Sequence, residues 1–297
     1  MKSRTLLFVA AFVCACTLGQ AQINPTFNPE KGEKYTYRQV TEQEISQSVA
    51  GQEIAMSIAT EMLTEMNVRD KNSSEVSVDY VYKEIVMTLL SDMMSFKVDT
   101  KNKTDNMSDI EKMGASLFGC IIGKTLQVVV TPDGSVKSVT GFNAILDDMK
   151  KIMAPLGDIE QQMSSVFVQS FNDESLKNTF QQIFKIYPGK EVKTGESWSN
   201  ENSFENAGMS NNVKNTFTFK SVSNDVALID LTSEQTVKSG AGMEGEMKGE
   251  VKGDMRLNVK TGMPVQTSSE GNVKGKLSAQ GMEVSMDITT KTSVTLQ

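Results

Sequence analysis

The stretch from Met243 to Val259 reads MEGEMKGEVKGDMRLNV and alternates between two kinds of residue. Its odd-numbered positions hold only Met, Gly, Val or Leu, and its even-numbered positions hold charged residues or Asn. Because successive side chains of a strand point to opposite faces, this period predicts a β-strand with one apolar and one hydrated face. A strand of this length is roughly two to three times longer than usual, which predicts a tall, twisted antiparallel sheet.

The same alternation extends in both directions from this stretch. Residues 265–279 and 282–296 repeat it, and so do the long runs that follow Tyr35, Ile54 and Glu75. Turns are indicated by Gly51, by the polar residues 70–74 and by Pro132-Asp-Gly. The sequence therefore predicts two β-rich halves, 33–141 and 190–297, and leaves open whether they form one sheet or two.

Between these halves the period changes to three and four over residues 142–186. Phe142, Ile145 and Met149 begin a pattern that predicts two or three amphipathic helices, broken near Pro155 and Asn172. A further helix is predicted after Ser108, because Ser108-Asp-Ile-Glu forms a capping box. The expected fold is mainly β within the α+β class. It is a large curved antiparallel sheet or open half-barrel in one β-rich domain, 22–297, with the helical segment on the concave face.

Two short motifs recur in the two halves. Residues 32–36 (GEKYT) align with residues 195–199 (GESWS), and residues 132–136 (PDGSV) align with residues 260–265 (KTGMPV), with one insertion. The recurrence fits an internal duplication, and it equally fits independent use of the same strand and turn residues.

The first 21 residues have the pattern of a secretory signal peptide. Lys2 and Arg4 precede an apolar run from Leu6 to Leu18, and Gly19-Gln-Ala follows it. We expect cleavage after Ala21 and a periplasmic or secreted protein. Lipid attachment at Cys16 is an alternative.

Composition excludes several kinds of chemistry. The chain has no His, which removes Ser-His-Asp and Cys-His catalysis and the usual zinc and haem ligands. After signal removal Cys120 is the only cysteine, and its apolar neighbours indicate a buried residue. The formal charge of −7, with 30 basic and 37 acidic residues, argues against a nucleic-acid partner. We expect no cofactor, no metal site, no catalytic residue and no transmembrane segment in the mature chain.

Apolar residues in the strand and helix patterns are the candidates for ligand binding. Gly residues alternate with the apolar side chains of the 243–259 strand and indicate strong curvature, a closely packed helix or a ligand groove. Met side chains adapt to irregular cavities. The candidate ligand-binding residues are Met247, Val251, Met255, Met149, Met153 and Phe167.

Four segments carry a resemblance to a known family. They are Lys31–Tyr35 (KGEKY), Val128–Val136 (VVVTPDGSV), Tyr187-Pro-Gly-Lys and Val192–Trp198 (VKTGESW). With the leader and the long strands, they resemble uncharacterised secreted proteins of Bacteroidota that form a domain of unknown function. The overall plan is also similar to envelope lipoprotein carriers, in which a curved half-barrel wraps around helices and holds acyl chains. This second resemblance implies a binder of lipid-like molecules.

Three hypotheses about function follow. The first is a non-catalytic envelope protein that binds a hydrophobic or amphipathic small molecule between sheet and helices. The second is a structural protein that binds an envelope protein partner through a strand edge or an apolar patch. The third, a hydrolase with two carboxylates, is less favoured because the chain has one Trp and few aromatic residues for stacking on sugars.

Overall fold

The computed structural model describes residues 21–49, 51–92, 94–102, 107–154, 173–206, 209–239, 243–279 and 282–297. The predicted signal peptide, apart from Ala21, lies outside the described residues, as does the segment 155–172 with Phe167. The predictions made for these segments therefore stay predictions.

Fourteen strands and three helices make up the described part of the chain. The strands are β1 (Gln22–Ile23), β2 (Lys34–Val49), β3 (Gln52–Lys71), β4 (Val76–Ser91), β5 (Ser95–Asp99), β6 (Thr125–Val130), β7 (Val136–Thr140), β8 (Val192–Lys193), β9 (Ser197–Asn206), β10 (Met209–Ser223), β11 (Val226–Lys238), β12 (Met243–Asn258), β13 (Pro264–Ala279) and β14 (Met282–Leu296). The long strands confirm the prediction from alternation, whereas the short strands β1, β5 and β8 were not predicted.

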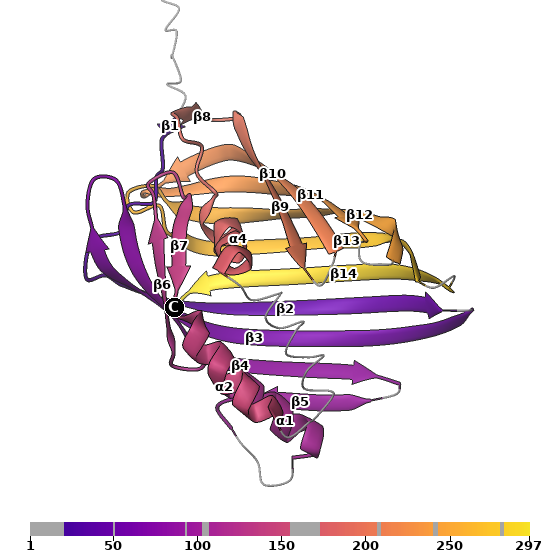
Figure 1. Ribbon diagram of the computed structural model, residues 1–297. Helices are drawn as coiled ribbons and strands as arrows, with labels where there is room; N and C mark the ends of the chain where they lie inside the picture. The colour runs from indigo at the N-terminus through magenta and orange to yellow at the C-terminus, as the bar shows by residue number, and fades with distance from the viewer. Residues whose placement is uncertain are drawn as a thin grey trace, which may run out of the picture.

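The two β-rich halves form one antiparallel sheet (Figure 1). Its order is β7-β6-β4-β3-β2-β14-β13-β12-β11-β10-β9, with β5 beside β4, which makes twelve strands in the described residues. The last strand, β14, pairs with β2 and joins the halves at the centre. The sheet is not closed into a barrel, since β7 and β9 are its two edges. A separate small sheet pairs β1 with β8.

Strand crowding accounts for the glycines of β12. A Cβ atom added to Gly249 would overlap the carbonyl oxygen of Asn272, and one added to Gly253 would overlap that of Ser268. Both carbonyls belong to β13, so it is the neighbouring strand, and not a helix, that requires glycine here. This observation favours curvature, one of the explanations that the sequence had left open.

The three described helices are short. They are α1 (Asp109–Gly119), α2 (Phe142–Met153) and α4 (Asp173–Phe184). The capping box at the start of α1 is confirmed, because Ser108 Oγ accepts from Glu111 N and the Glu111 carboxylate accepts from Ser108 N. The segments α2 and α4 fall within the predicted helical region. Helix α4 contacts both edge strands, β7 and β9.

The recurring G-E motif has the same local structure in both halves. Gly32 and Gly195 both have φ of +88°. Gly32 N donates to Val68 O at 2.9 Å, and Gly195 N donates to Phe219 O at 2.7 Å. In return, Val68 N donates to Glu33 O, and Phe219 N donates to Glu196 O. In each half the glutamate is the residue that follows the glycine. The agreement extends to a register shift just after each acceptor, in β3 and β10, and it favours duplication over independent use of turn residues.

Candidate functional site

A cavity of about 300 Å³ lies between one face of the sheet and the C-terminal part of α4. Eight strands contribute to its wall, from β4 through β2 and β14 to β10, and most of the contributing side chains are apolar or aromatic. The lining residues are Phe27, Tyr37, Gln39, Thr64, Met66, Tyr80, Gln182, Ile183, Phe184, Ile186, Tyr187, Asn215, Phe217, Leu231, Met255, Met263, Pro264, Thr267 and Val294.

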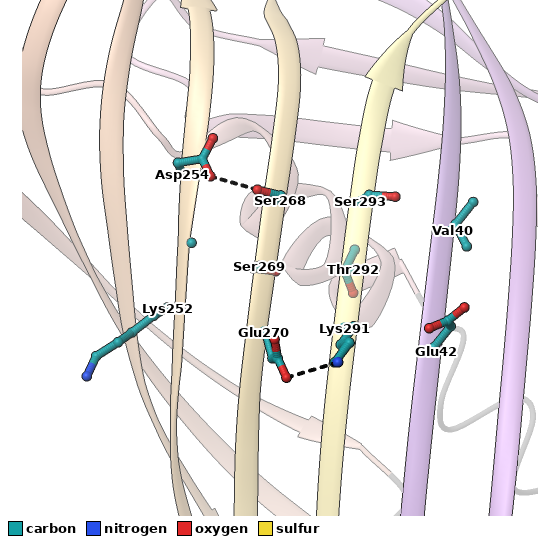
Figure 2. Close-up of a pocket in the computed structure, with 11 residues that line it drawn as sticks. Val40, Glu42, Lys252, Asp254, Ser268, Ser269, Glu270, Lys291, Thr292 and Ser293 are labelled. Carbon is teal, nitrogen blue, oxygen red and sulfur yellow. Dashed lines mark hydrogen bonds and ion pairs between the residues drawn. The ribbon is translucent and has the colours of Figure 1, made fainter.

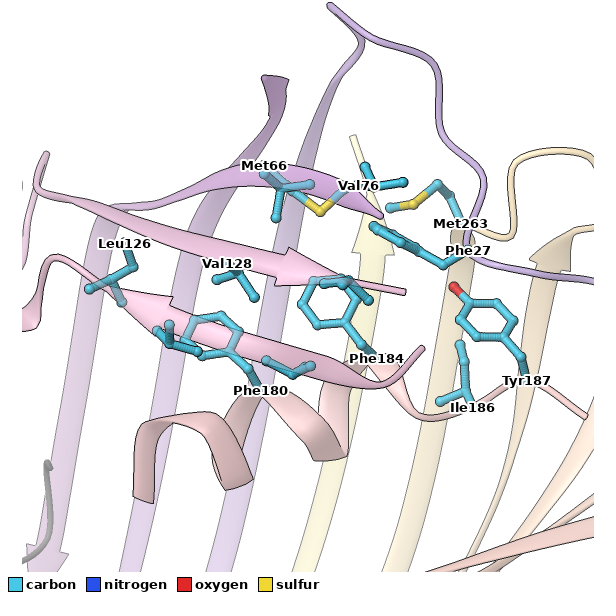
Figure 3. Close-up of a cluster of buried hydrophobic side chains, with 14 of the residues drawn as sticks. Phe27, Met66, Val76, Leu126, Val128, Phe180, Phe184, Ile186, Tyr187 and Met263 are labelled. Atoms are coloured by element: carbon cyan, nitrogen blue, oxygen red, sulfur yellow. The ribbon is translucent and has the colours of Figure 1, made fainter. Parts of the chain in front are cut away.

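Aromatic side chains form one end of the cavity and join it to the core. Phe27 meets Phe184 edge to face, with ring centroids 5.1 Å apart, and lies beside Tyr187 (Figure 3). Tyr80 contacts Phe180 of α4 at 5.1 Å, also edge to face. Edge-to-face pairs are a favoured aromatic geometry, so they fix the rings and give this end of the cavity a rigid wall.

The C-terminal end of α4 is held against both edges of the sheet. On one side, Val136 N donates to Gln181 Oε1 at 3.0 Å, and Lys185 pairs with Asp133 in the β6–β7 turn. On the other side, Trp198 Nε1 of β9 donates to Ile186 O at 3.0 Å. The helix therefore spans the opening between the two edge strands and covers the cavity.

The same residues explain the charge state of the Asp133 carboxyl. Partial burial alone would raise its pKa, but hydrogen bonds from Lys185, Thr131 and Ser135 outweigh burial and hold the pKa well below its ordinary value. Asp133 is therefore ionised at neutral pH, and its pairing with Lys185 ties α4 to the sheet.

Tyrosine hydroxyls supply polar groups near the cavity without supplying charge. Burial raises the pKa of Tyr80 and raises the pKa of Tyr37 and Tyr187 well above the ordinary value of 10. Tyr37 Oη donates to Pro264 O at 3.0 Å, and Tyr187 Oη donates to Gly262 O at 2.8 Å. The hydroxyls of Tyr37 and Tyr187 are therefore neutral donors bonded to backbone carbonyls, which makes them positioning groups and not acids or bases.

The structure distributes the predicted ligand-binding residues over two places. Met255 lines the cavity. Met247 and Val251 lie further along β12 at positions of the same parity, outside the cavity lining. Met149 and Met153 are buried in the core on α2, and they too are not among the lining residues. Phe167 lies outside the described residues.

Several lining residues carried no recognisable signal in the sequence. Phe27 lies in a segment without regular secondary structure, and Tyr187 follows α4, where its motif indicated only the end of a helix. Tyr37, by contrast, belongs to the alternating face of β2, which could have identified it.

The other face of the sheet carries a second, shallow hollow of about 700 Å³ (Figure 2). Its charged groups are largely paired. Lys291 Nζ lies 3.2 Å from Glu270, and Ser268 Oγ donates to Asp254 at 2.7 Å. Both members of the Lys291–Glu270 pair are well exposed, and exposed charges of this kind are screened by water and salt and contribute little binding energy. We regard the apolar cavity under α4 as the better candidate site.

Cys120 is a buried free thiol, as its apolar neighbours predicted. Burial, together with the nearby Asp148, raises its pKa and keeps it neutral. Among the described residues no group of three or more Cys, Asp or Glu side chains is placed to hold a metal ion. None of the described helices combines the length and apolarity that a bilayer span requires.

Comparison with known proteins assigns the chain to a family. The family model that matches covers residues 73–264. The chain belongs to DUF6263, a family of unknown function. No curated protein matches it in sequence. The DUF6263 region begins just before β4, which it includes whole, and ends at the first residue of β13.

Solved structures show distant likeness only. A structure titled "lipid-protein interactions in lipovitellin" matches at 10% identity and a TM-score of 0.48, over 90% of this chain and 25% of that one. This chain thus spans about a quarter of the lipovitellin chain. OccK5 of Pseudomonas aeruginosa matches at 6% identity and 0.24, over 89% and 98% of the two chains. A porin mutant of Rh. blastica matches at 8% and 0.22, over 87% and 99%. None of these three reaches a TM-score of 0.5, so none bears on function.

Proposed function

We propose that this protein is a non-catalytic binding protein of the cell envelope that holds a hydrophobic or amphipathic, lipid-like ligand between its sheet and helices. The observation that carries the proposal is the cavity under α4, whose wall is mostly apolar. Its volume is at the lower end of the about 300–1,000 Å³ typical of ligand pockets. A small ligand, or one end of a longer one, therefore fits it.

In this proposal the sheet acts as an open half-barrel whose concave face carries the helices and the ligand. The leader-like first 21 residues support export to the periplasm or beyond. The fixed contacts of α4 with both edge strands support a cavity that exists before the ligand binds. A preformed site loses little conformational freedom on binding, which favours affinity.

The carboxyl groups support a non-catalytic role. Each described carboxyl with a shifted pKa has it lowered, as hydrogen bonds and lysines do for Glu65 and Asp148. A hydrolase of the two-carboxylate type needs one acid whose pKa is raised so that it stays protonated. The hydrolase hypothesis would therefore need a carboxyl group with a raised pKa.

The ligand-binding proposal can be tested with the uncharged fluorophore N-phenyl-1-naphthylamine, whose emission rises in apolar surroundings. We expect saturable binding at one site and at least a tenfold loss of affinity in Leu231→Trp, because Leu231 lines the cavity and the larger ring would fill it. The matched control is Leu228→Trp, since Leu228 lies on the same strand but is 37% exposed. Absence of saturable binding, or equal effects of the two variants, would contradict the proposal.

A second candidate function is interaction with another envelope protein. Leu90 and Met94 are 50% and 45% exposed, and both lie at the β4–β5 connection. Exposed large apolar side chains that lie together are typical of contact surfaces. Loss of a co-purifying protein in Leu90→Ser, with N-phenyl-1-naphthylamine binding intact, would favour this function.

A further inference from the structure

The strand register defines which side chains face the cavity. Gln39, Val294, Thr267 and Met255 occupy directly opposed positions on four neighbouring strands, β2, β14, β13 and β12. All four line the cavity. Directly opposed residues of antiparallel strands point to the same face, so this row identifies the cavity face on every strand that it crosses.

The cavity face carries no charged side chain on the long strands. On β2, on β9–β14 and on β3 as far as Val68, every residue in phase with that row is apolar or aromatic, or is Gly, Ser, Thr, Asn or Gln. The Lys, Arg, Asp and Glu residues of these segments lie on the opposite face, for example Lys252 and Glu270 in the outer hollow (Figure 2). Lys71, beyond the register shift of β3, lies outside the cavity lining and pairs with Glu30. The residues that α4 adds to the cavity lining are likewise uncharged.

This absence of charge excludes some ligands on physical grounds. A carboxylate or phosphate that is buried without a partner loses its hydration and gains nothing in return, which is strongly unfavourable. The closest candidate cation on α4's own segment, Lys185, is already paired with Asp133 and donates to Ser135 Oγ at 2.7 Å. An anionic headgroup would therefore enter the cavity without a counter-charge.

Neutral polar groups are present on the same face and two of them lack partners. Ser233 is only 4% exposed, and its Oγ has no hydrogen-bond partner in the described part of the chain. The same holds for Asn202 Nδ2. Ser233 is directly opposed to Asn215, which lines the cavity. Buried polar groups are normally hydrogen-bonded, and both atoms can donate, so they indicate a hydrogen-bond acceptor that the free protein does not supply. The lack of a counter-charge on the cavity face favours a neutral acceptor over an anionic one.

We infer that the ligand is an uncharged amphipathic lipid of the acylglycerol kind, whose hydroxyl or ester groups bond to the neutral polar side chains of the cavity face. The inference rests on the proposed ligand-binding function and narrows its ligand class. A fatty-acid anion or a phospholipid would bind poorly, although its acyl chain has the same apolar surface to offer.

The test compares two ligands that share an acyl chain and differ in headgroup charge. Monooleoylglycerol and sodium oleate, both below their aggregation concentrations, are titrated at pH 8 into the delipidated protein. Emission of Trp198 reports binding, because it is the sole Trp and stacks on Phe217 of the cavity wall with ring centroids 5.5 Å apart. Native mass spectrometry gives the stoichiometry independently.

We expect monooleoylglycerol to bind at least ten times more tightly than oleate. Equal affinities, or tighter binding of oleate, would overturn the inference and leave the proposed function standing. If neither lipid binds and N-phenyl-1-naphthylamine does not bind either, the proposed function itself fails. If the fluorophore binds and neither lipid does, only the assignment of ligand class fails.

Two variants with a matched control test the same point from the protein side. Thr267→Lys places a cation at the cavity wall and should reduce the tenfold preference for the neutral lipid to threefold or less. The control Gln266→Lys adds the same charge on the neighbouring, exposed position and should leave the preference unchanged.

Ser233→Ala removes a single unpartnered atom and should weaken monooleoylglycerol binding about fivefold, while circular dichroism shows that the fold is intact. An unchanged affinity in Ser233→Ala, or unchanged discrimination in a folded Thr267→Lys, would contradict the inference.

Discussion

At the scale of single residues, Tyr187 lies between two glycine turns, those of Gly134 and Gly262. These turns belong to the segments 132–136 and 260–265, which align with each other in sequence. Its hydroxyl donates to Gly262 O at 2.8 Å, and a Cβ atom at Gly134 would lie 2.8 Å from its ring. Both glycines have positive φ, +80° for Gly134 and +72° for Gly262. The turns thus position one wall of the cavity, which gives their glycines a packing role as well as a conformational one.

Replacement of Gly262 by Ala should lower the free energy of unfolding more than replacement of Gly189. Both residues have positive φ, which costs an L-residue about 1–2 kcal/mol. Only at Gly262 would the new Cβ also overlap a backbone oxygen, that of Thr26, adding about 1–3 kcal/mol of overpacking. Urea denaturation of both variants measures the difference. Equal losses of unfolding free energy in the two variants would show that the backbone around Thr26 moves aside at no cost.

At the scale of elements, α4 occupies the opening between the two edges of the sheet. Edge strands expose unpaired backbone groups and are usually covered or charged. Here one helix contacts both edges, β7 and β9 (Figure 1). Three of its residues, Gln182, Ile183 and Phe184, also line the cavity. The Asp133–Lys185 pair and the Trp198–Ile186 bond attach it, one on each side, together with the bond from Val136 N to Gln181.

The attachment through Asp133 predicts a pH-dependent contribution to stability. Because the pKa of folded Asp133 lies below its ordinary value of 3.8, its contribution is complete above that value and is lost as the pH falls through the folded pKa. Asp133→Asn should therefore lower the free energy of unfolding at pH 7, by no more than about 1 kcal/mol since the carboxylate is half exposed. The gap between variant and wild type should narrow below pH 3.8 in thermal or urea unfolding. A gap that is independent of pH would show that ionisation of Asp133 contributes nothing.

At the scale of the whole molecule, the two halves are joined by the pairing of β14 with β2. The pairing runs from Val284 with Val49 to Leu296 with Tyr37, so the first and the last strand of the large sheet lie side by side at its centre. β14 is also paired along its length with β13. Disruption of this one strand should therefore affect both halves.

Thr290→Pro should test this arrangement. Thr290 is paired with Gln43 on one side and Gly271 on the other. Pro at such a central position removes a ladder hydrogen bond and leaves its acceptor unsatisfied, which costs about 1–3 kcal/mol. Thr290→Ala, which keeps the backbone donor, is the control and should cost much less. The midpoint of urea unfolding is the measurement, and similar midpoints for the two variants would argue against a central role of β14.

The sequence predicted local structure better than it predicted long-range pairing. The alternation of β12 correctly predicted its charged face and its apolar face, because a period of two places successive residues on opposite faces. The capping box correctly predicted the start of α1. The pairing of β14 with β2 was left open because it joins residues more than 200 positions apart, and no local pattern encodes such a register.

For the site, prediction was limited in the same way. Met255 could be predicted as a lining residue because alternation identifies the apolar face of its strand. Phe27 and Tyr187 could not, because they lie in irregular segments that only the assembled sheet brings together. The uncharged character of the cavity face was visible strand by strand in the sequence. Its meaning depends on the register, which shows that these faces are all on one side.

The central position of β14 has a consequence for the order in which the molecule can be completed. Among the described strands β14 is synthesised after all the others, so β2 and β13 each keep one unpaired edge until residues 282–296 have emerged. Exposed edges of that kind invite pairing with other chains. A chain truncated before residue 282 would keep both edges unpaired at the centre of the sheet, where proteases and chaperones that act on incompletely folded proteins can recognise them.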